Sequence, residues 1–397
     1  MDMNTETTHW LLNSDPSIRW QVMRDVLDAP EADWAAERAR LAHEGWCADL
    51  LGRQGSDGLW NNSLYNGKWL STTYSLYLLK LLGLPEGHPQ ALRGCEQLLA
   101  QGLYQGQEVR FSRRQAIQDL GVSALVLSLG CYFGCPNTAL PHMAAYLASQ
   151  QQVDGSWLPN ETPGAAEYAY EGTLMALEGL MQARQRYPKL ALAQAESRGQ
   201  EFLLAHSLGL EQGEALKKQW ASFSFPPYWF YDLLTALDYF CSVGAALDPR
   251  TQPALDVLRS RQAADGRWKL GARHAGKTYF DMEAVGQPSR WNTLRALRVL
   301  RWAEACTICS QLGEEAYGYQ KYGWAEHDIH LPAASEHLVL VRNLKPSYSE
   351  RKLQLCQCPQ CGTYYLYRTD YEYLVNGTED EQFLTRLTAQ QAAEFLD

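Results

Sequence analysis

The chain has 397 residues, a net charge of −10 and 46% hydrophobic residues, which is enough to bury a substantial core. Its acidic balance, with no lysine and arginine cluster interleaved with aromatics, argues against a nucleic-acid ligand. No secretory signal is visible, and the most apolar segment, 120–135, is too short to cross a bilayer. We therefore expect a soluble, cytoplasmic protein without an integral membrane segment or a disulfide framework.

A seven-residue phrase of the form QxxDGxW occurs three times, at 54–60, 151–157 and 262–268. Each copy follows an amphipathic stretch and precedes a more apolar one. The Asp-Gly pair supplies a turn in which glycine takes positive φ, and the tryptophan ring can pack against a neighbouring repeat. The spacings of 97 residues (151 − 54) and 111 residues (262 − 151) are about twice the length of a helical hairpin, which predicts worn copies between them.

Six apolar helices are predicted in chain order, starting near Ser17, Ser71, Asp119, Tyr170, Pro227 and Ser289. Charged amphipathic helices are predicted between them, at about 32–53, 88–102, 138–151, 190–207 and 248–263. A helix that is apolar on nearly every side is buried, whereas one with an apolar stripe is half exposed. These patterns predict an all-α unit over 1–310, an α/α toroid in which about six inner helices stand inside five to six outer helices.

Copies of QxxDGxW before inner helices resemble the repeats of squalene–hopene cyclases, oxidosqualene cyclases and the β-subunits of protein prenyltransferases, which share an α/α toroid. The resemblance covers about residues 10–305. The segments 223–232 (FSFPPYWFYD) and 288–297 (PSRWNTLRAL) also resemble bacterial proteins labelled squalene cyclase-like, a group without a settled activity. The resemblance implies a fold rather than a reaction, because such toroids serve unrelated enzymes.

In such a toroid, the first turns of the inner helices surround the mouth of a central cavity. In this chain these turns combine aromatic and polar residues, which is typical of a ligand pocket. The predicted substrate-binding residues are Arg19, Trp20, Trp69, Thr73, Asp119, Tyr170, Trp229, Tyr231, Trp291, Asn292 and Arg295.

The resemblance to class II terpene cyclases implies a carboxylic acid from a DxDD-type motif that protonates an alkene. The chain lacks this motif, and Glu171 falls where its central aspartate would be. Two interpretations stay open: Glu171 and Asp232 act as acid and base, or they cap helices and pair with arginines. Asp281 and Glu283 are a second candidate pair. They act as acid and base, bind a divalent ion, or stabilise the N-terminus of the following helix through its dipole. No phosphate loop, HExxH or GxSxG occurs, so we expect neither a nucleotide cofactor nor a serine hydrolase.

Beyond about residue 310 the helical pattern ends, and strands are predicted at 337–341, 352–355 and 364–367. The sequence Cys358-Pro359-Gln360-Cys361-Gly362 is typical of a zinc-knuckle hairpin, and a structural zinc site needs four ligands. The other two ligands come from Cys306 and Cys309, or from His327, His330 and His337; a ribbon that has lost its metal is the alternative. We expect 311–397 to be a small β-rich, zinc-ribbon-like module with a helix over 376–397, and Cys306, Cys309, Cys358 and Cys361 to be the zinc ligands.

Three functions stay open, and with them whether the protein is an enzyme. The toroid binds an apolar, isoprenoid-like molecule, with Glu171 and Asp232 as acid/base groups; or it is a non-catalytic scaffold that contacts a protein partner through the C-terminal module. The third function is carbohydrate processing, because aromatic platforms with paired carboxylates also cleave sugars. A deep aromatic cavity favours the first function, a filled centre the second, and an open groove with separated carboxylates the third.

Overall fold

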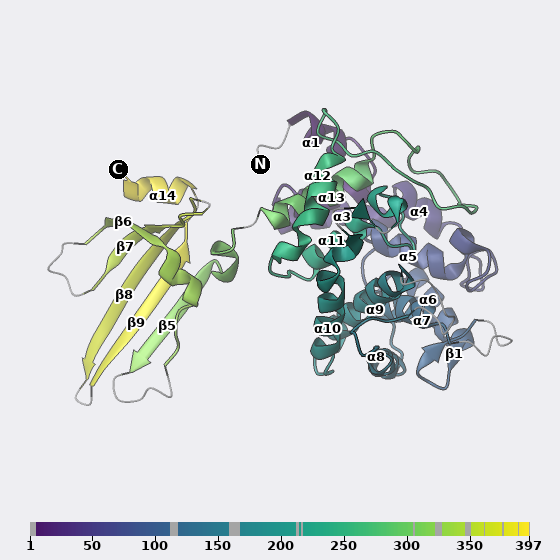
Figure 1. Cartoon of the computed structure of the whole chain (residues 1–397), viewed down its shortest axis with the longest axis horizontal. Coiled ribbons are helices and arrows are strands. Elements are labelled where there is room, and N and C mark those ends of the chain that lie inside the picture. Colours follow the sequence, from purple (N-terminus) through teal and green to yellow (C-terminus); the bar gives the residue numbers. More distant parts are fainter. Residues whose placement is uncertain are drawn as a thin grey trace. The chain divides into compact units, whose positions relative to one another are not determined.

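The computed structural model describes most of the chain and divides it into two compact units, Met1–Ala303 and Glu304–Asp397 (Figure 1). The residues that it describes are 5–111, 118–158, 167–211, 214–215, 217–304, 306–321, 328–345, 351–360, 362–374, 377–387 and 389–396. Within these residues, no helix is long and apolar enough to span a membrane.

The first unit is helical, with two short two-stranded hairpins, β1 (Leu103–Tyr104) with β2 (Glu108–Val109) and β3 (Leu210–Glu211) with β4 (Glu214–Ala215). Its described α-helices are α1 (Thr5–Leu12), α2 (Pro16–Asp25), α3 (Glu31–Ala39), α4 (Gly45–Leu51), α5 (Thr72–Leu82), α6 (Pro89–Gly102), α7 (Leu120–Tyr132), α8 (Leu140–Ser149), α9 (Glu167–Arg186), α10 (Ala193–Ala205), α11 (Leu233–Ser242), α12 (Gln252–Ser260) and α13 (Arg290–Ala303).

Buried and half-exposed helices alternate along this unit, as predicted. Every residue of α7 from Leu120 to Cys131 is buried, whereas α3 buries none of its residues. The amphipathic helices α6, α8, α10 and α12 each bury part of their surface and leave most of their charged residues exposed to solvent; Glu196 of α10 is buried and pairs with Arg184.

The six most buried helices contact one another in a closed succession. Helix α5 packs against α7, α7 against α9, α9 against α11, α11 against α13, and α13 against α2. The last step back to α5 is made by α2, because Trp20 Nε1 and Gln21 Nε2 donate hydrogen bonds to the carbonyls of Leu82 and Leu81 at 3.0 and 3.1 Å. Each of these helices therefore contacts two others of the set.

The three QxxDGxW phrases have the same geometry. Their tryptophans are fully buried, and each Nε1 donates to the carbonyl ten residues earlier, in the pairs Trp60–Leu50, Trp157–Leu147 and Trp268–Leu258 at 2.7, 2.8 and 2.8 Å. The backbone N–H of each tryptophan donates at 3.0 Å to a threonine hydroxyl of the next buried helix, which is Thr72, Thr173 or Thr293. The predicted positive φ is confirmed for Gly58, Gly155 and Gly266 at 84°, 92° and 80°. The motif therefore joins the end of one partly exposed helix to the start of the next buried one.

The predicted helix start near Pro227 is wrong, because α11 begins at Leu233. Tyr228 has a φ of 52°, in the left-handed region, so the chain is not helical there. The N-cap is instead Asp232, whose Oδ1 accepts the N–H of Thr235 at 2.7 Å. The segment 223–231 is thereby left as an irregular aromatic stretch.

The second unit contains a five-stranded antiparallel sheet with the order β5-β9-β8-β7-β6. Its elements are β5 (Glu315–Lys321), β6 (Val339–Asn343), β7 (Leu353–Gln357), β8 (Tyr364–Leu374), β9 (Gly377–Arg386) and α14 (Ala389–Leu396). The three predicted strands are confirmed as β6, β7 and β8. The predicted helix over 376–397 is wrong for 377–386, because this segment pairs with β8 on one side and β5 on the other.

Candidate functional site

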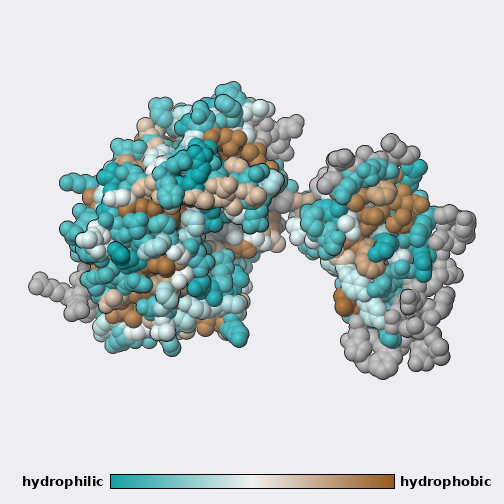
Figure 2. Space-filling view, turned by 180° about the vertical axis from the view of Figure 1, so that it is seen from behind, coloured by the Kyte–Doolittle hydropathy of each residue, from teal (hydrophilic) through white to brown (hydrophobic). Residues whose placement is uncertain are grey.

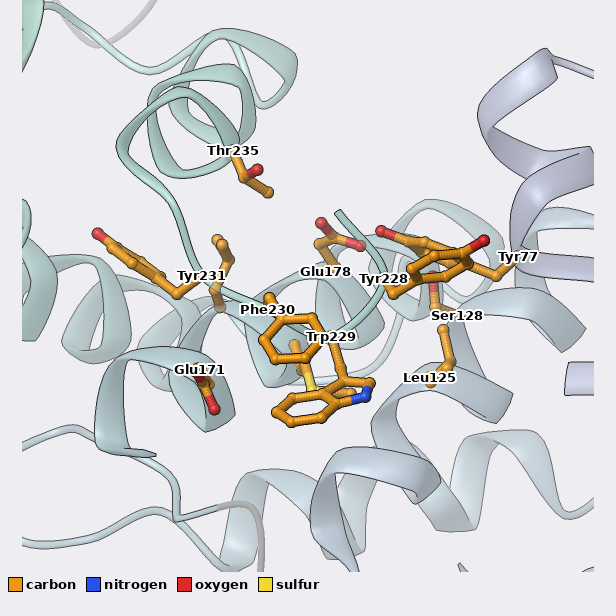
Figure 3. A pocket seen from close by; sticks show the side chains of 12 residues that line it. Tyr77, Leu125, Ser128, Glu171, Glu178, Tyr228, Trp229, Phe230, Tyr231 and Thr235 are labelled. Carbon is orange, nitrogen blue, oxygen red and sulfur yellow. The ribbon is translucent and has the colours of Figure 1, made fainter. Parts of the chain in front are cut away.

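Three cavities of the helical unit surround the aromatic segment 228–231. The largest, which we call the Glu171 cavity, has a volume of about 160 Å³. A smaller cavity of about 20 Å³, which we call the inner cavity, is lined by Tyr77, Leu125 and Glu178, among others (Figure 3). A third, the loop cavity of about 40 Å³, is lined by Trp69, Tyr228 and residues 273–274 and 278–283.

Polar and charged side chains outnumber aromatic ones in the wall of the Glu171 cavity. The polar side chains are Glu171, Lys217, Gln219, Ser222, Ser224, Asp232 and His274. The aromatic ones are Tyr168, Trp220, Trp229, Phe230 and Tyr231, and Ala272 completes the wall. Such a wall offers hydrogen bonds together with flat ring faces.

Stacked rings fill the space between the cavities. Tyr228 stacks on Trp69 with ring centroids 3.8 Å apart and an interplanar angle of 7°. Phe230 lies between His274, at 3.8 Å and 5°, and Trp229, at 3.9 Å and 21°. The predicted binding residues Trp69 and Trp229 therefore each have one face covered by another ring of the protein (Figure 3 shows Trp229 beside Phe230).

Glu171 lies near the start of α9 and is only 5% exposed. It lines both the Glu171 cavity and the inner cavity, and Figure 3 shows it among the residues that line the inner one. The neighbouring Tyr170 is also buried and contacts the rings of Trp220 and Tyr231. Tyr170 itself lines none of the three cavities.

Asp232 lines the Glu171 cavity, but both of its carboxylate oxygens accept hydrogen bonds from nearby residues of the chain. Its Oδ1 accepts from the N–H and the hydroxyl of Thr235 at 2.7 and 2.8 Å. Its Oδ2 accepts the N–H of Ser224 at 3.2 Å and lies 3.4 Å from the Ser224 hydroxyl. This is the capping arrangement that was one of the two interpretations of this residue.

Two residues of this cavity that the sequence did not single out as a pair are Ser224 and His274. Their Oγ and Nε2 atoms are 2.9 Å apart. Burial lowers the pKa of His274 to about 4, and the charge of Asp232 opposes this shift. The two residues are 50 positions apart on irregular segments, so no motif spacing marks the pair.

Asp281 and Glu283 line the loop cavity, not the Glu171 cavity. Asp281 is exposed and pairs with Arg273, and the hydrogen bond from Arg273 lowers the Asp281 pKa. Glu283 caps α13, because its carboxylate accepts the Arg290 N–H at 2.6 Å and the hydroxyl of Ser289. Burial raises the Glu283 pKa. The structure thus places these carboxylates in contacts with an arginine and a helix N-terminus.

The remaining predicted binding residues line none of the three cavities; besides Tyr170 they are Arg19, Trp20, Thr73, Asp119, Trp291, Asn292 and Arg295. Several make contacts with other residues of the helical unit instead. Arg19 donates to Glu37 at 2.6 Å, Asp119 caps α7 through the Val122 N–H at 2.9 Å, and Trp291 stacks on Phe225 at 4.2 Å. The others likewise bond to the protein: Trp20 to the Leu82 carbonyl, Thr73 to the Leu64 carbonyl, Asn292 to the carbonyls of Phe223 and Lys269, and Arg295 to Asp238.

The second unit brings together three of the four predicted metal ligands. The sulfur atoms of Cys306, Cys309 and Cys358 lie within 4.8 Å of one another, and all three residues are buried. The Cys306 and Cys358 sulfurs are 3.3 Å apart, near the separation of about 3.8 Å that Zn–S bonds of about 2.3 Å give in a tetrahedral site. The cluster can therefore hold a metal ion. Cys361 and His327 lie outside the described residues, and His330 and His337 do not belong to the cluster.

Comparisons with known proteins give structural similarity alone. No protein-family model and no curated protein sequence matches the chain. A crystal structure of a protein from Actinoplanes is 20% identical, with a TM-score of 0.41, covering 73% of this chain and 90% of that one. The type II terpene cyclase MstE from Scytonema, solved with its substrate geranylgeranyl dihydroxybenzoate, is 13% identical, with a TM-score of 0.40 and coverages of 72% and 86%. An unsaturated glucuronyl hydrolase specific for heparin is 11% identical, with a TM-score of 0.40 and coverages of 72% and 83%.

Proposed function

We propose that the helical unit is an α/α toroid that binds a compact, polar small molecule in the Glu171 cavity, where Glu171 transfers a proton to or from it. The closed succession of contacts among α2, α5, α7, α9, α11 and α13 supports the toroid. The observation that carries the function is the composition of one cavity, in which a buried carboxylate, polar side chains and tryptophan rings share a wall.

The volume of the cavity limits the size of the ligand. A cavity of about 150 Å³ in another protein accommodates benzene, so the 160 Å³ of the Glu171 cavity accommodates about one six-membered ring with its substituents. The polar side chains in this wall favour a ring that carries hydroxyl groups, with Trp229 available to its apolar face. A hexose or hexuronic acid has this size and chemistry, which favours the carbohydrate-type function among the three.

A long isoprenoid fits this centre less well. Leu125, Leu174 and Met175 contribute apolar surface to the inner cavity, but its volume is about 20 Å³. An isoprenoid chain would have to displace Trp229 and Phe230, and would lose the stacking of Phe230 on His274. We therefore rank the isoprenoid ligand below the compact polar ring.

Glu171 is the carboxylate that we assign to proton transfer. Both oxygens of Asp232 already accept hydrogen bonds from Thr235 and Ser224, and a proton taken up there would weaken the cap of α11. Glu171 is 5% exposed and lines the cavity beside Trp229, Phe230 and Tyr231. Asp232 is thus a structural residue of the site, and Glu171 is its reacting group.

A non-catalytic scaffold is the second candidate function, and the observation in its favour is the stack of rings that fills the centre. In that case a protein partner would contact the C-terminal unit. Figure 2 shows hydrophobic residues gathered on the visible face of this unit, and its edge strand β6 leaves Val339 and Leu340 54% and 48% exposed.

We further propose that the C-terminal unit, 304–397, is zinc-ribbon-like and that Cys306, Cys309, Cys358 and Cys361 bind a structural zinc ion. The convergence of three buried sulfur atoms supports this proposal. Zinc held there would link the 306–309 segment to the turn between β7 and β8, which are otherwise joined by few side-chain bonds, such as Thr307 Oγ1 to Gln360 at 2.7 Å. A reduced, cytoplasmic environment keeps these thiols available for metal.

Ligand-detected NMR on the full chain tests the cavity proposal. The probes are glucose, glucuronic acid and geranylgeraniol, and the variants are Glu171→Gln, Trp229→Ala and the control Glu201→Gln, an exposed carboxylate on α10. We expect saturation transfer to a sugar probe with the wild type and with Glu201→Gln, and its loss with the other two. Binding of geranylgeraniol alone, or sugar binding that Glu171→Gln leaves unchanged, would contradict the proposal.

A further inference from the structure

Ser224 and His274 bring a hydroxyl and an imidazole together in the wall of the Glu171 cavity. The 2.9 Å between Ser224 Oγ and His274 Nε2 is a hydrogen-bond distance, and both residues line the same cavity. A hydroxyl in contact with a base, beside space for a ligand, is the arrangement that nucleophilic catalysis requires. Neither residue has a role in the proton transfer assigned to Glu171.

Aromatic contacts fix the imidazole ring. Phe230 stacks on one face of His274 at 3.8 Å with an angle of 5°, and Trp69 and Tyr228 present ring edges to it at 6.4 and 6.3 Å. In many serine enzymes a carboxylate orients the histidine; here ring stacking does so. Burial, which lowers the pKa of His274 to about 4, leaves the imidazole neutral and able to accept a proton at neutral pH.

Asp232 holds the serine rather than the histidine. Its Oδ2 accepts the Ser224 N–H at 3.2 Å, which fixes the backbone of Ser224 at the edge of the cavity and leaves the hydroxyl proton to His274, the nearer acceptor. The same negative charge raises the pKa of His274 against the effect of burial. It therefore favours the imidazolium that forms when the histidine takes up the serine proton.

Although the missing GxSxG motif predicted no serine hydrolase, we propose that Ser224 is a nucleophile activated by His274, and that the cavity takes an ester of a compact hydroxylated ring. This inference rests on the proposed function only for the position and size of the ligand. Ser224 Oγ forms a bond to the ester carbonyl carbon while its proton passes to His274 Nε2. The tetrahedral intermediate collapses as the C–O bond to the alcohol breaks, and the alcohol leaves with that proton.

Hydrolysis of the acyl-serine repeats these steps with water. His274 accepts a proton from water, the hydroxide oxygen bonds to the acyl carbon, and the bond to Ser224 Oγ breaks as the proton returns to the serine. Lys217 lines the same cavity, with its Nζ 5.9 Å from the centre of the Trp220 ring. It brings a positive charge to the wall of the cavity in which the oxyanion develops.

A fluorophosphonate probe tests this inference on the full chain without a known substrate. Attack by Ser224 Oγ forms a P–O bond and breaks the P–F bond, fluoride leaves, and the adduct is located by mass spectrometry of peptides. We expect labelling at Ser224, none in Ser224→Ala, and a rate at least about 100-fold lower in His274→Asn. The control variants Ser242→Ala and His142→Asn, on exposed residues of α11 and α8, keep the wild-type rate.

The labelling rate should also rise as the pH increases from about 3.5 to about 5 and then stay level. Only neutral His274 accepts the serine proton, and its pKa is about 4. An unlabelled wild type, an adduct that survives Ser224→Ala, or a wild-type rate in a folded His274→Asn variant would overturn the inference. Thermal melting of each variant shows whether it is folded. A wild type that binds a sugar but is not labelled removes this inference alone, whereas one that is labelled but binds no sugar removes the proposed ligand class alone.

Discussion

Arg298 of α13 links α11 to α2, the first buried helix of the chain, so its removal should destabilise the whole helical unit. From α13, its Nε and Nη2 donate to the Asp238 carboxylate of α11 at 2.8 and 2.9 Å. Its Nη1 donates to Asp25 Oδ2 of α2 at 2.7 Å. The Arg298 side chain is 20% exposed and those of Asp238 and Asp25 18% and 11%, so the network is largely shielded from solvent.

The expected cost of Arg298→Met follows from these bonds. Breaking a buried ion pair by removing one partner costs about 3–5 kcal/mol, and the remaining contact of Asp238 with Arg295 at 3.1 Å reduces this to about 3 kcal/mol. A unit of 303 residues has an unfolding entropy of about 0.6 kcal/mol per kelvin, so its Tm should fall by about 5 °C. Arg301→Met is the matched control one turn later, where the pair with exposed Asp28 should be worth at most about 1 kcal/mol.

The pH dependence gives a second readout of the same network. Burial alone would raise the Asp238 pKa, but the charges of Arg298 and Arg295 outweigh it and lower that pKa. A depressed carboxylate pKa contributes stability that is present above the unfolded pKa of about 4 and is lost as the pH falls through the folded value. Calorimetry should therefore show the gap between wild type and Arg298→Met at pH 7 and its narrowing below about pH 4. Equal Tm values at pH 7 would refute the role of Arg298.

Three further outcomes are expected. Gly155→Ala should lower the Tm more than Gly244→Ala, because both have positive φ but only the Gly155 Cβ would meet a backbone atom, the Arg198 carbonyl oxygen at 2.5 Å; equal losses by calorimetry would contradict this. Elemental analysis of gently purified protein should find close to one equivalent of zinc. The Cys306→Ser variant should lose most of this zinc, and the control variant Cys241→Ser should keep it. Less than about a tenth of an equivalent in the wild type would reject the site. Trp157→Ala should lower the free energy of unfolding by about 3–5 kcal/mol in chemical unfolding, because it removes a fully buried ring and its hydrogen bond to the Leu147 carbonyl. A decrease below about 1 kcal/mol would show that the turn does not depend on the ring.

The repeated turns could be predicted because their physics is local. Asp154 accepts the N–H of Ser156 at 2.9 Å, Gly155 supplies the positive φ, and Gln151 donates to the Gly155 carbonyl at 2.9 Å, all within seven residues. The start of α11 could not be predicted in the same way. Apolar residues from Pro227 onward predicted a helix. The left-handed φ of Tyr228 prevents a helix there, and the cap at Asp232 places its start at Leu233.

Strand β9 shows how long-range pairing decides local structure. The acidic run at 379–381 is favourable in the first turn of a helix, yet it forms a strand because it lies between β5 and β8. The candidate site was only partly predictable for the same reason. Glu171 could be found from its place near the start of a buried helix, whereas Ser224 and His274 meet only after the chain has folded.

Most of the predicted binding residues that line no cavity are explained by their own partners. A first turn can present Arg19 or Arg295 toward a centre, but nearby carboxylates, Glu37 and Asp238, bind these guanidinium groups at 2.6 and 3.1 Å. A sequence pattern indicates which helices surround the centre, and it does not indicate which side of each helix turns inward. That side is set by the packing of neighbouring helices.

A crystal structure of the full chain grown with glucuronic acid in one experiment and geranylgeraniol in another would locate the ligand. We expect one sugar ring in the Glu171 cavity, with a hydroxyl or ring oxygen within hydrogen-bond distance of the Glu171 carboxylate and the Trp229–Phe230–His274 stack unchanged. An isoprenoid chain running through the centre, with Trp229 and Phe230 displaced and no sugar bound, would contradict the proposed function.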